Sequence, residues 1–415
     1  MDQNQPAPEG QPWPAEEPRQ RRRTAGARRA GRRRRAIVLC GVVALAVAAG
    51  AWAAFGRGGG PAVHHPRASA AAAPLHRRSE SRSVRFVVEA SGDLLIHSAI
   101  FERALVLGGG RHYNFAPFFE QIKPYIQGAD LPLCHVETPM TPAPPTGYPV
   151  FSTPPELATA IAQTGWRACS TAATHTLDQG QTGVDDTIRA LDHAGVRHTG
   201  SFSSAAAQRT PLIMTVKGVR VAFLAYTELT NGIPSPHPWS VNRASAAQIL
   251  SDAHRARTDG AKVVIVNLHW GDEDVVQPSG FQLGLAEQLT RSPDITAIVG
   301  QHVHIVQPIR ILNGKLVVFG EGNLISNQTS ACCPAASQDG IIVLLTISAD
   351  SRGARVTFIH YVPIWVRHPD YVVLPAGTAW RTDPADAASL RASYERTVAV
   401  AGRGPQTQPI PDHLP

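Results

Sequence analysis

Two histidines, His302 and His304, end the segment Val299-Gly300-Gln301-His302-Val303-His304. The apolar residues 295–298 before it predict a buried strand, and the glycine marks where that strand ends. Ligands collect at the carboxyl ends of strands in open α/β sheets. Two imidazoles at i and i+2 of an extended segment point the same way and can bind one metal ion such as Zn, Mn or Fe. For this pair alone, an ordinary hydrogen-bonding role is an equally good interpretation.

Four further predicted strands also end in residues of metal-ligand type. The strands are residues 84–90, 130–136, 166–171 and 262–268, and the polar residues that follow or end them are Asp93, Glu137, His175 and His269. A single residue of this kind is more often a turn or cap residue. Five strand ends together favour one shared site, because each group buried alone would carry its own desolvation cost. Carboxylates with several imidazoles suit two metals held about 3.5–4 Å apart, with a bridging carboxylate and a hydroxide nucleophile.

Strands and helices alternate along residues 84–366. We expect helices at residues 100–106, 115–126, 156–164, 184–194 and 281–290, a hairpin at 211–226 turning at Lys217-Gly218, a strand at 315–319, and closing antiparallel strands at 341–348 and 355–361. This order predicts one α/β domain. Residues 367–415 are Pro-rich and weakly patterned, and we expect a tail that wraps the surface.

The positive charge of the chain is concentrated at its start. The 415 residues carry a net charge of +7, and residues 1–35 hold ten arginines against Asp2, Glu9, Glu16 and Glu17. The remainder is nearly neutral, so nothing in it indicates a nucleic-acid partner. Residues 1–35 have almost no aliphatic content and predict a disordered tail. Residues 56–83 are rich in Gly, Ala, Pro, His and Arg and predict a linker.

Residues 36–55 are uncharged and long enough for one transmembrane helix. The basic run Arg32-Arg33-Arg34-Arg35 precedes them, which predicts a cytoplasmic N-terminus and an extracellular domain in the cell membrane. A cleaved signal is the alternative, since Ala68-Ser69-Ala70 has the composition of a cleavage site and Arg34-Arg35 that of a weak twin-arginine signal. The long tail favours the anchor, and both interpretations export the domain.

Five cysteines are consistent with export. Cys40 lies in the predicted membrane helix, and the other four permit two disulfides. They are Cys134, Cys169, Cys332 and Cys333. The sequence does not fix their pairing.

The motifs together resemble the poly-γ-glutamate capsule biosynthesis family (CapA-like), which is similar to the calcineurin-like metallophosphoesterases. The resemblance covers residues 84–365 and is carried, in order, by Gly92-Asp93, Glu137-Thr138-Pro139, His175 with Leu177-Asp178-x-Gly180, His269-Trp270-Gly271-Asp272-Glu273, Gly300-x-His302-x-His304 and Gly322-Asn323. The His-Trp-Gly and Gly-x-His-x-His elements are the specific ones. The resemblance implies a four-layer α/β/β/α sandwich with its site at the strand ends.

The resemblance also implies roles for single residues. Asp93 corresponds to the carboxylate of the first metal, Glu137 to the bridging one, and His175 to an acid or transition-state partner. The implied imidazole ligands are His269, His302 and His304. Around them, Asp178 is expected to orient His175 or to cap a helix, His97 to support the site from behind or begin a helix, and Asn323 to line the site or form a turn. Glu228 is interpreted as a solvated turn residue.

Two positions depart from the family pattern. The family usually has Asn-Leu-Glu where this chain has His135-Val136-Glu137, and Asn-Asn-His where it has Ala173-Thr174-His175. The missing amide before His175 is ordinarily a metal ligand, and the Thr174 hydroxyl is a poorer one. His135 shares a face with Glu137 and can compensate if it reaches the site. Two ions of Mn, Fe or Zn, or only one, are equally supported.

The leading functional hypothesis is an exported, metal-dependent hydrolase of capsule or envelope polymer biosynthesis. In that hypothesis a water activated by the metals attacks a phosphoester, and His175 gives a proton to the leaving group. The resemblance also implies an anionic polymer, poly-γ-glutamate, whose carboxylates can bind the same metals, and a capsule-synthesis membrane complex as partner. The alternative is a non-catalytic envelope scaffold or binding protein with a degenerate metal site.

Overall fold

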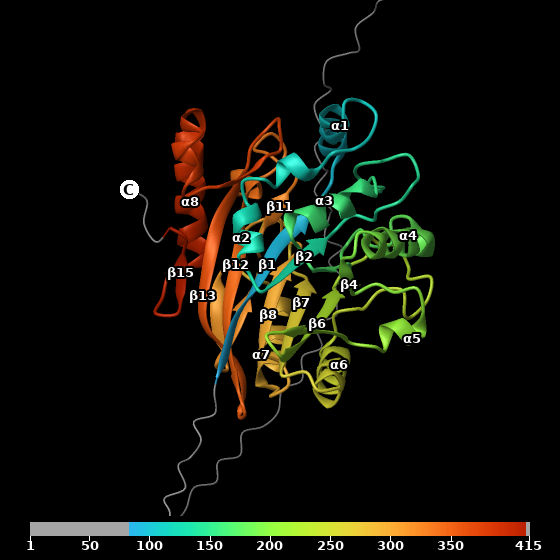
Figure 1. Ribbon diagram of the computed structural model, residues 1–415, viewed down its shortest axis with the longest axis vertical. Coiled ribbons are helices and arrows are strands. Elements are labelled where there is room, and N and C mark those ends of the chain that lie inside the picture. Colours follow the sequence, from blue (N-terminus) through green and yellow to red (C-terminus); the bar gives the residue numbers. More distant parts are fainter. Residues whose placement is uncertain (1–82, 412–415) are drawn as a thin grey trace, which may run out of the picture. The chain divides into compact units, whose positions relative to one another are not determined.

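The computed structural model describes residues 83–411. The predicted Arg-rich tail, the predicted membrane helix and residues 56–82 of the predicted linker lie outside the described residues. Within residues 83–411, no helix combines the length and the hydropathy needed to cross a bilayer. The described residues belong to one compact unit, whose first strand begins at Val84 (Figure 1).

The first sheet has nine strands and holds the beginning and the end of the unit. Along it lie β14 (Val373–Pro375), β13 (Gly353–Val366), β12 (Asp339–Asp350), β1 (Val84–Leu94), β2 (Leu131–Val136), β3 (Ala168–Ser170) and β4 (Arg197–Thr199), while β11 (Asn323–Ile325) pairs with β1 and β15 (Thr407–Pro409) with β13. The strands β1 to β4 run parallel. Their carboxyl ends therefore meet at one edge of this sheet.

The second sheet has six strands. Its order is β5 (Leu212–Val216), β6 (Val219–Thr227), β7 (Val263–His269), β8 (Ala297–Gln301), β10 (Lys315–Val318) and β9 (Ile309–Leu312). The predicted hairpin is confirmed, since β5 and β6 pair around Lys217 and Gly218. Both turn residues have positive φ, 47° and 80°, as a two-residue hairpin turn requires. Strands β6, β7 and β8 run parallel and end at Thr227, His269 and Gln301.

The two sheets pack face to face, and helices cover their outer sides. Val88 and Leu133 of the first sheet share a core with Ile265 and Val299 of the second. On the outer side of the first sheet lie α1 (Ser98–Leu107), η1 (Ala116–Phe118), α2 (Lys123–Gln127) and α3 (Glu156–Thr164). The outer side of the second sheet is covered by α6 (Ala246–Thr258) and α7 (Gly280–Arg291). The four layers that the resemblance implied are therefore present (Figure 1).

Alternation along single strands produces these layers. In β7, Val263 and Ile265 face the core between the sheets, whereas Val264 and Val266 face the helices. Successive side chains of a strand point to opposite faces, so a strand buried on both sides reads as a continuous apolar run. The remaining helices are α4 (Gly180–His193), α5 (Ala205–Gln208), α8 (Ala387–Ala401) and the short η2 (Ala335–Gln338), η3 (Ala379–Arg381) and η4 (Pro384–Asp386).

Several segments differ from the sequence interpretation, which named no helix at α6 and ended the first strand at residue 90, whereas β1 runs to Leu94. Residues 115–126 form two short helices, η1 and α2, because Pro117 and Pro124 each occupy a first-turn position and neither is tolerated inside a longer helix. Residues 367–411 contain β14, α8 and β15, which pack on β13, where the sequence indicates a tail. In α8 the residues Leu390 and Tyr394 lie in a small core with Leu374. Alanines occur all around this helix, so its sequence shows no clear apolar face.

Candidate metal centre

Asp93 lies where β1 leaves its regular pairing with β2. Its register partner is His135 on one side and Asn323 of β11 on the other, and the register of β1 shifts at this point on both sides. The glycine before it is required, because a Cβ on Gly92 would lie 1.8 Å from the carbonyl oxygen of Gly322. The close approach of β11 therefore holds the Asp93 carboxylate at the strand ends.

Residues of both sheets meet around this carboxylate. His135 Nε2 from the first sheet lies 2.9 Å from His269 Nδ1 of the second and 3.5 Å from Asp93 Oδ1. The backbone N–H of His302 donates to Asp93 Oδ2 at 3.2 Å. His304 Nδ1 lies 3.6 Å from the same oxygen. The four histidines and Asp93 are all buried.

Three overlapping groups could each hold an ion. In each group, one ligand atom per residue lies within 4.8 Å of the others, and the groups are Asp93 with His135 and His269, Glu137 with His269 and His302, and Asp93 with Glu137 and His304. Asp93, Glu137 and His269 each belong to two groups. The structure thus brings together all six residues that the sequence assigned to the metal, and their shared membership suits two adjoining ions.

The loop after β8 is strained where it presents the imidazoles. His302 has a φ of 93° and His304 a φ of 59°, which is the left-handed region that side chains with a Cβ avoid. Each such residue costs about 1–3 kcal/mol, and strain of this kind gathers at functional sites. Near the end of β8 only glycine fits, because a Cβ on Gly300 would lie 2.1 Å from the carbonyl oxygen of Phe319.

Both departures from the family pattern face the centre. The Thr174 hydroxyl lies 2.9 Å from His269 Nε2 and 3.2 Å from His302 Nδ1. His135, fully buried, lies on the same side. His135 could compensate for the missing amide only if its side chain reached the metal centre, and it does reach it.

Three of the four imidazoles, those of His135, His269 and His302, are held neutral, as metal ligands must be. Burial lowers the pKa of His135 to about 4, although the charge of Asp93 opposes this. Burial and the neighbouring His304 lower the pKa of His302 to about 3. Burial and the imidazoles of His302 and His135 lower the pKa of His269 well below its ordinary range.

The carboxylates show that the site needs positive charge. Burial and the charge of Asp93 raise the pKa of Glu137 well above its ordinary range. Burial alone would lower the pKa of His304, but the negative charge of Glu137 and the hydrogen bond with Asp93 raise it to about 10. Two buried carboxylates thus draw a proton onto a neighbouring imidazole, and a cation at the same place would satisfy them equally.

Unsatisfied atoms fit the same conclusion. Glu137 Oε2 and His135 Nδ1 are buried and make no hydrogen bond within the described residues. Buried polar atoms without a partner are rare in folded proteins and call for a specific reason. A donor set of two carboxylates and four imidazoles suits Zn, Mn or Fe ions, so the residues present fit the predicted metal.

His175 lies beside the centre, and Asp178 orients its ring. Its Nδ1 lies 2.7 Å from Asp178 Oδ2, and the same oxygen accepts a hydrogen bond from the Phe151 N–H at 2.7 Å. Asp178 therefore orients the imidazole and does not cap a helix, since the residue at the start of α4 is Gln179. With Nδ1 engaged, Nε2 is the ring nitrogen left for a substrate.

Two other predicted residues hold the loops around the centre. Asn323 Oδ1 lies 3.1 Å from His304 Nδ1, so this amide orients a ligand and is more than a turn residue. His97 begins α1 and accepts a hydrogen bond from the Asn327 N–H at 3.2 Å. Burial and the nearby His304 lower the pKa of His97 to about 3.

The sequence interpretation misses one side chain, Asn231, and gives a wrong role to another, Glu228. Asn231 Nδ2 donates to Asp178 Oδ1 at 3.0 Å and to the carbonyl of Pro149 at 2.9 Å, which ties three loops together. Its only local signal is a residue type that tolerates the positive φ of 51° found there. Glu228 is half-buried and accepts a hydrogen bond from the Gly271 N–H at 3.0 Å, so it supports the loop after β7 and is no solvated turn residue.

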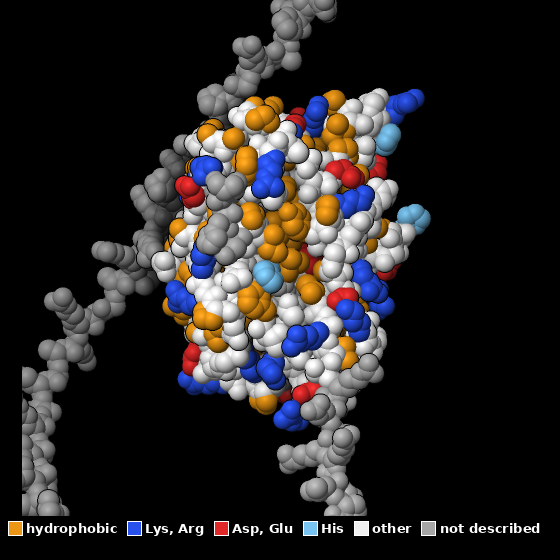
Figure 2. All heavy atoms as spheres, turned by 60° about the vertical axis from the view of Figure 1, so that its left-hand side comes forward, with side chains coloured by type: hydrophobic (Ala, Val, Ile, Leu, Met, Phe, Trp, Pro, Cys, Tyr) orange, Lys and Arg blue, Asp and Glu red, His pale blue; other side chains and the backbone are white. Residues whose placement is uncertain are grey.

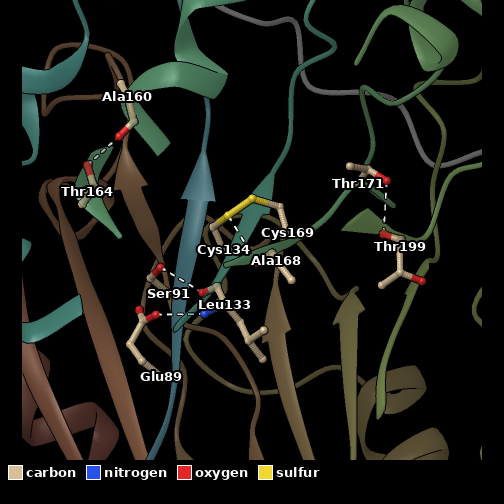
Figure 3. Close-up of a disulfide and its surroundings, with 10 residues drawn as sticks. All are labelled: Glu89, Ser91, Leu133, Cys134, Ala160, Thr164, Ala168, Cys169, Thr171 and Thr199. Atoms are coloured by element: carbon tan, nitrogen blue, oxygen red, sulfur yellow. Dashed lines mark hydrogen bonds between the residues drawn. A yellow bond between two sulfur atoms is a disulfide. The ribbon is translucent and has the colours of Figure 1, made fainter. Parts of the chain in front are cut away.

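A disulfide lies one residue before His135. Cys134 of β2 is bonded to Cys169 of β3, its register partner, and both are buried on the helix-covered side of the sheet (Figure 3). Cys332 is exposed and free. Because β3 has only three residues, the bond adds a covalent link to the short pairing of β3 with β2, just before the loop with Thr174 and His175.

Residues 87–328 match the family described as bacterial capsule synthesis protein PGA_cap. The chain belongs to this capsule synthesis family. The resemblance found in the sequence is therefore confirmed, and the match contains every residue of the centre, from Asp93 to Asn323.

The relatives of this chain include two proteins from bacteria. The "Capsule biosynthesis protein CapA" of Bacillus anthracis is 27% identical over 274 residues, which are 63% of this chain and 64% of the relative. A "Probable polyglutamine synthesis accessory protein" of Mycobacterium tuberculosis is 25% identical over 215 residues, covering 48% of this chain and 55% of the relative. The PGA_cap member thus spans less than two thirds of the length of these relatives.

Among solved structures, the calcineurin-like phosphoesterase YfkN from Bacillus subtilis has a TM-score of 0.45 and 13% identity to this PGA_cap member. The comparison covers 75% of this chain and all of that one.

Proposed function

We propose that this capsule synthesis protein is a metal-dependent hydrolase acting on an anionic polymer or a phosphoester at the cell envelope. The single observation that carries the proposal is the convergence of two carboxylates and four imidazoles, from both sheets, on a buried centre with unpartnered ligand atoms. The names of the relatives support capsule polymer as the context, and poly-γ-glutamate as one candidate substrate.

The protein residues divide the work. Asp93, Glu137, His135, His269, His302 and His304 would hold two divalent ions of Mn, Fe or Zn. Such ions polarise the group under attack and acidify a water molecule. His175 lies beside them with Nδ1 tied to Asp178, so its Nε2 can hold a proton for the leaving group. Asn323 fixes the ring of His304, as the outer partners of metal ligands commonly do.

We further propose that the domain is exported and anchored by the predicted helix at residues 36–55. The Cys134–Cys169 disulfide supports this, because such bonds persist mainly in oxidising compartments outside the cytoplasm. An extracellular domain tethered to the membrane would act next to a polymer-synthesis complex.

A second candidate function is a non-catalytic envelope scaffold. The observation that favours it is Thr174, whose hydroxyl lies between His269 and His302. A hydroxyl is a weaker neutral ligand than an amide, so one of the two ions would be held less firmly.

Metal analysis combined with turnover separates the two candidates. We expect the purified full-length protein to hold two equivalents of Mn, Fe or Zn and to hydrolyse bis(p-nitrophenyl) phosphate or poly-γ-glutamate. His302→Ala should lose both properties, whereas His193→Ala, at an exposed site on α4, should keep them. One bound ion or none, with no turnover on any phosphoester or glutamyl polymer, would favour the scaffold.

One further variant separates the proton donor from the ligands. We expect His175→Asn to lower turnover by about 100-fold while the bound metal stays at the wild-type level, because acid catalysis contributes about 10²–10⁴-fold. A loss of metal in this variant would instead make His175 a ligand.

A further inference from the structure

Glu321 joins the two sheets beside the metal centre. Its backbone N–H donates to the Gly300 carbonyl of the second sheet at 2.8 Å, and its carbonyl accepts from the Ile341 N–H of the first sheet at 2.8 Å. Two residues further on, Asn323 begins β11 and contacts His304. Glu321 therefore lies where the two sheets meet, next to a side chain that orients a predicted metal ligand.

The side chain of Glu321 is bonded to Gln301, the residue before His302. Gln301 Nε2 donates to Glu321 Oε2 at 2.6 Å, and both residues are fully buried. Val299 faces the core between the sheets, so Gln301, two residues further along β8, points into the same interior. The second oxygen of each side chain, Glu321 Oε1 and Gln301 Oε1, is buried and makes no hydrogen bond within residues 83–411.

No positive charge accompanies the carboxyl group of Glu321 within the described part of the chain. The face that Figure 2 shows carries its acidic and basic side chains at the surface, where water solvates them. The charged groups that act on Glu321 are Glu89 and Asp93, and both are acidic. Burial raises the pKa of Glu321 well above its ordinary range, and the two like charges raise it further, although the Gln301 hydrogen bond opposes this. An ionised carboxylate without a partner is very costly to bury, so the group carries a proton instead.

One proton accounts for both unpaired oxygens. A protonated carboxyl group has an O–H that donates, and Gln301 Oε1 is an acceptor on the side chain to which Glu321 is already bonded. A carboxylic acid and an amide that face each other form two parallel hydrogen bonds, one in each direction. An ionised Glu321 has no hydrogen to donate, and it would leave the Gln301 oxygen buried without a partner.

The pair acts on the loop that carries the imidazoles. Gln301 is the last residue of β8, and His302 follows it with a φ of 93°, while the His302 N–H donates to Asp93 Oδ2 at 3.2 Å. A strained residue keeps its conformation only when the structure around it holds it in place. Because Glu321 is bonded to both sheets, its bond to Gln301 fixes the strand end from which His302 begins.

We infer that Glu321 is a neutral carboxylic acid paired with Gln301 through two hydrogen bonds, and that this pair positions His302 for metal binding. Glu321 is a positioning residue, since it acts through Gln301. Its proton also keeps a further negative charge away from Asp93. The pairing stands on the burial and the hydrogen bonds alone, whereas the effect on His302 rests on the metal-dependent function proposed above.

Infrared spectroscopy of the purified full-length protein at about pH 7 tests the pairing. A protonated carboxyl group has a carbonyl stretching band that is separate from the bands of carboxylates and amides. We expect the difference spectrum between the wild type and Glu321→Gln to contain this band, both with metal bound and after its removal. A carboxylate band in its place would overturn the inference.

Competition with a chelator measures the effect of the pair on the metal. Glu321→Leu removes the pair, and we expect metal affinity to fall by about tenfold or more, since groups around metal ligands typically contribute about 10–100-fold. Glu321→Gln keeps two hydrogen bonds with Gln301, because an amide both donates and accepts, and it should restore the wild-type affinity. The exchange of both residues, Glu321→Gln with Gln301→Glu, reverses the pair and should restore the affinity as well.

The matched control is Glu89→Leu, which removes another fully buried acid, one that is bonded to the Leu133 N–H. This control should keep the wild-type metal affinity. Equal losses in Glu89→Leu and Glu321→Leu would overturn the positioning role, and so would wild-type affinity in Glu321→Leu. A wild-type protein that binds no metal would contradict the proposed function together with the positioning role, while the infrared band decides the pairing independently. Near-ultraviolet circular dichroism shows that each variant is folded.

Discussion

His135 Nε2 lies 2.9 Å from His269 Nδ1, and the two rings stack nearly parallel at 4.9 Å between centroids. One histidine comes from each sheet, and Asp93 Oδ1 lies within 3.8 Å of both. The position where the family usually carries an amide thus carries an imidazole that reaches the shared centre.

His135→Ala tests whether this imidazole is a ligand. We expect the variant to lose about one equivalent of bound metal, because Asp93 and His269 would be left to hold that ion without their third partner. Elemental analysis of the purified protein measures the loss. The exposed His193→Ala should bind as much metal as the wild type, and an unchanged metal content in His135→Ala would remove His135 from the ligand set.

Thr174→Asn tests the second departure in the opposite direction. The hydroxyl lies 3.2 Å or less from nitrogen atoms of His269 and His302, so an amide oxygen at this place adds a stronger neutral ligand. We expect the more weakly held metal to bind about tenfold tighter, in line with the effect of single groups around metal sites. Competition with a chelator gives the affinity. A Thr174→Asn protein that binds metal no better would mean that His135 already fills the role of the amide.

Glu89 makes stability depend on pH. It is fully buried, accepts a hydrogen bond from the Leu133 N–H at 3.1 Å and leaves Oε1 unpartnered, and burial raises its pKa to about 8 from an ordinary 4.5 (Figure 3). Between these values the folded state binds more protons than the unfolded state, so stability falls as the pH rises through this range. We expect Glu89→Gln to flatten that dependence.

Urea unfolding of both proteins between pH 5 and pH 9 measures the effect of Glu89. The Gln variant should be the more stable protein above about pH 8, where the wild type must bury a charge. Parallel pH profiles of the two proteins would show that Glu89 is neutral or charged in both states alike.

Removal of the disulfide should cost stability and loosen the loop behind β3. The bond spans 35 residues, for which restriction of the unfolded chain gives about 3–4 kcal/mol. We expect Cys134→Ser with Cys169→Ser to lower the free energy of unfolding by that order, and a reductant to do the same to the wild type. Cys332→Ser should unfold as the wild type does under both conditions. Equal stability of all three proteins would contradict this role of the bond.

The sequence predicts the ends of β7 and β8 well because these two strands are mostly apolar. The predicted strands at residues 262–268 and 295–298 are followed by His269 and, a few residues on, His302, and the structure ends β7 and β8 at His269 and Gln301. Carboxyl ends of parallel strands share an edge, so the convergence of Asp93, Glu137, His269, His302 and His304 follows from the strands, whereas His135 entered the ligand set only through comparison with the family pattern.

Contacts between distant loops could not be predicted in this way. Asn231 bonds to Asp178 across 53 residues, and no local pattern indicates that partnership. Residues 387–401 form α8, whose apolar side is short and mixed with alanines, so its packing on β13 decides the helix where local propensity does not. The pairing of Cys134 with Cys169 likewise follows from the register of β2 and β3, which only the fold supplies.

Asp93 and His135 lie in one sheet and Glu137 directly follows its strand β2, whereas His269 lies in the other sheet and His302 directly follows its strand β8. A binding site with ligands from both sheets forms only when the sheets have docked. The affinity for an ion at this site and the free energy of docking are therefore linked by mass action. Chelation should therefore weaken the whole sandwich, and a supply of ions at a hundred times the dissociation constant would stabilise it by about 2.7 kcal/mol. In an environment poor in these ions, the folded population of the protein itself would fall.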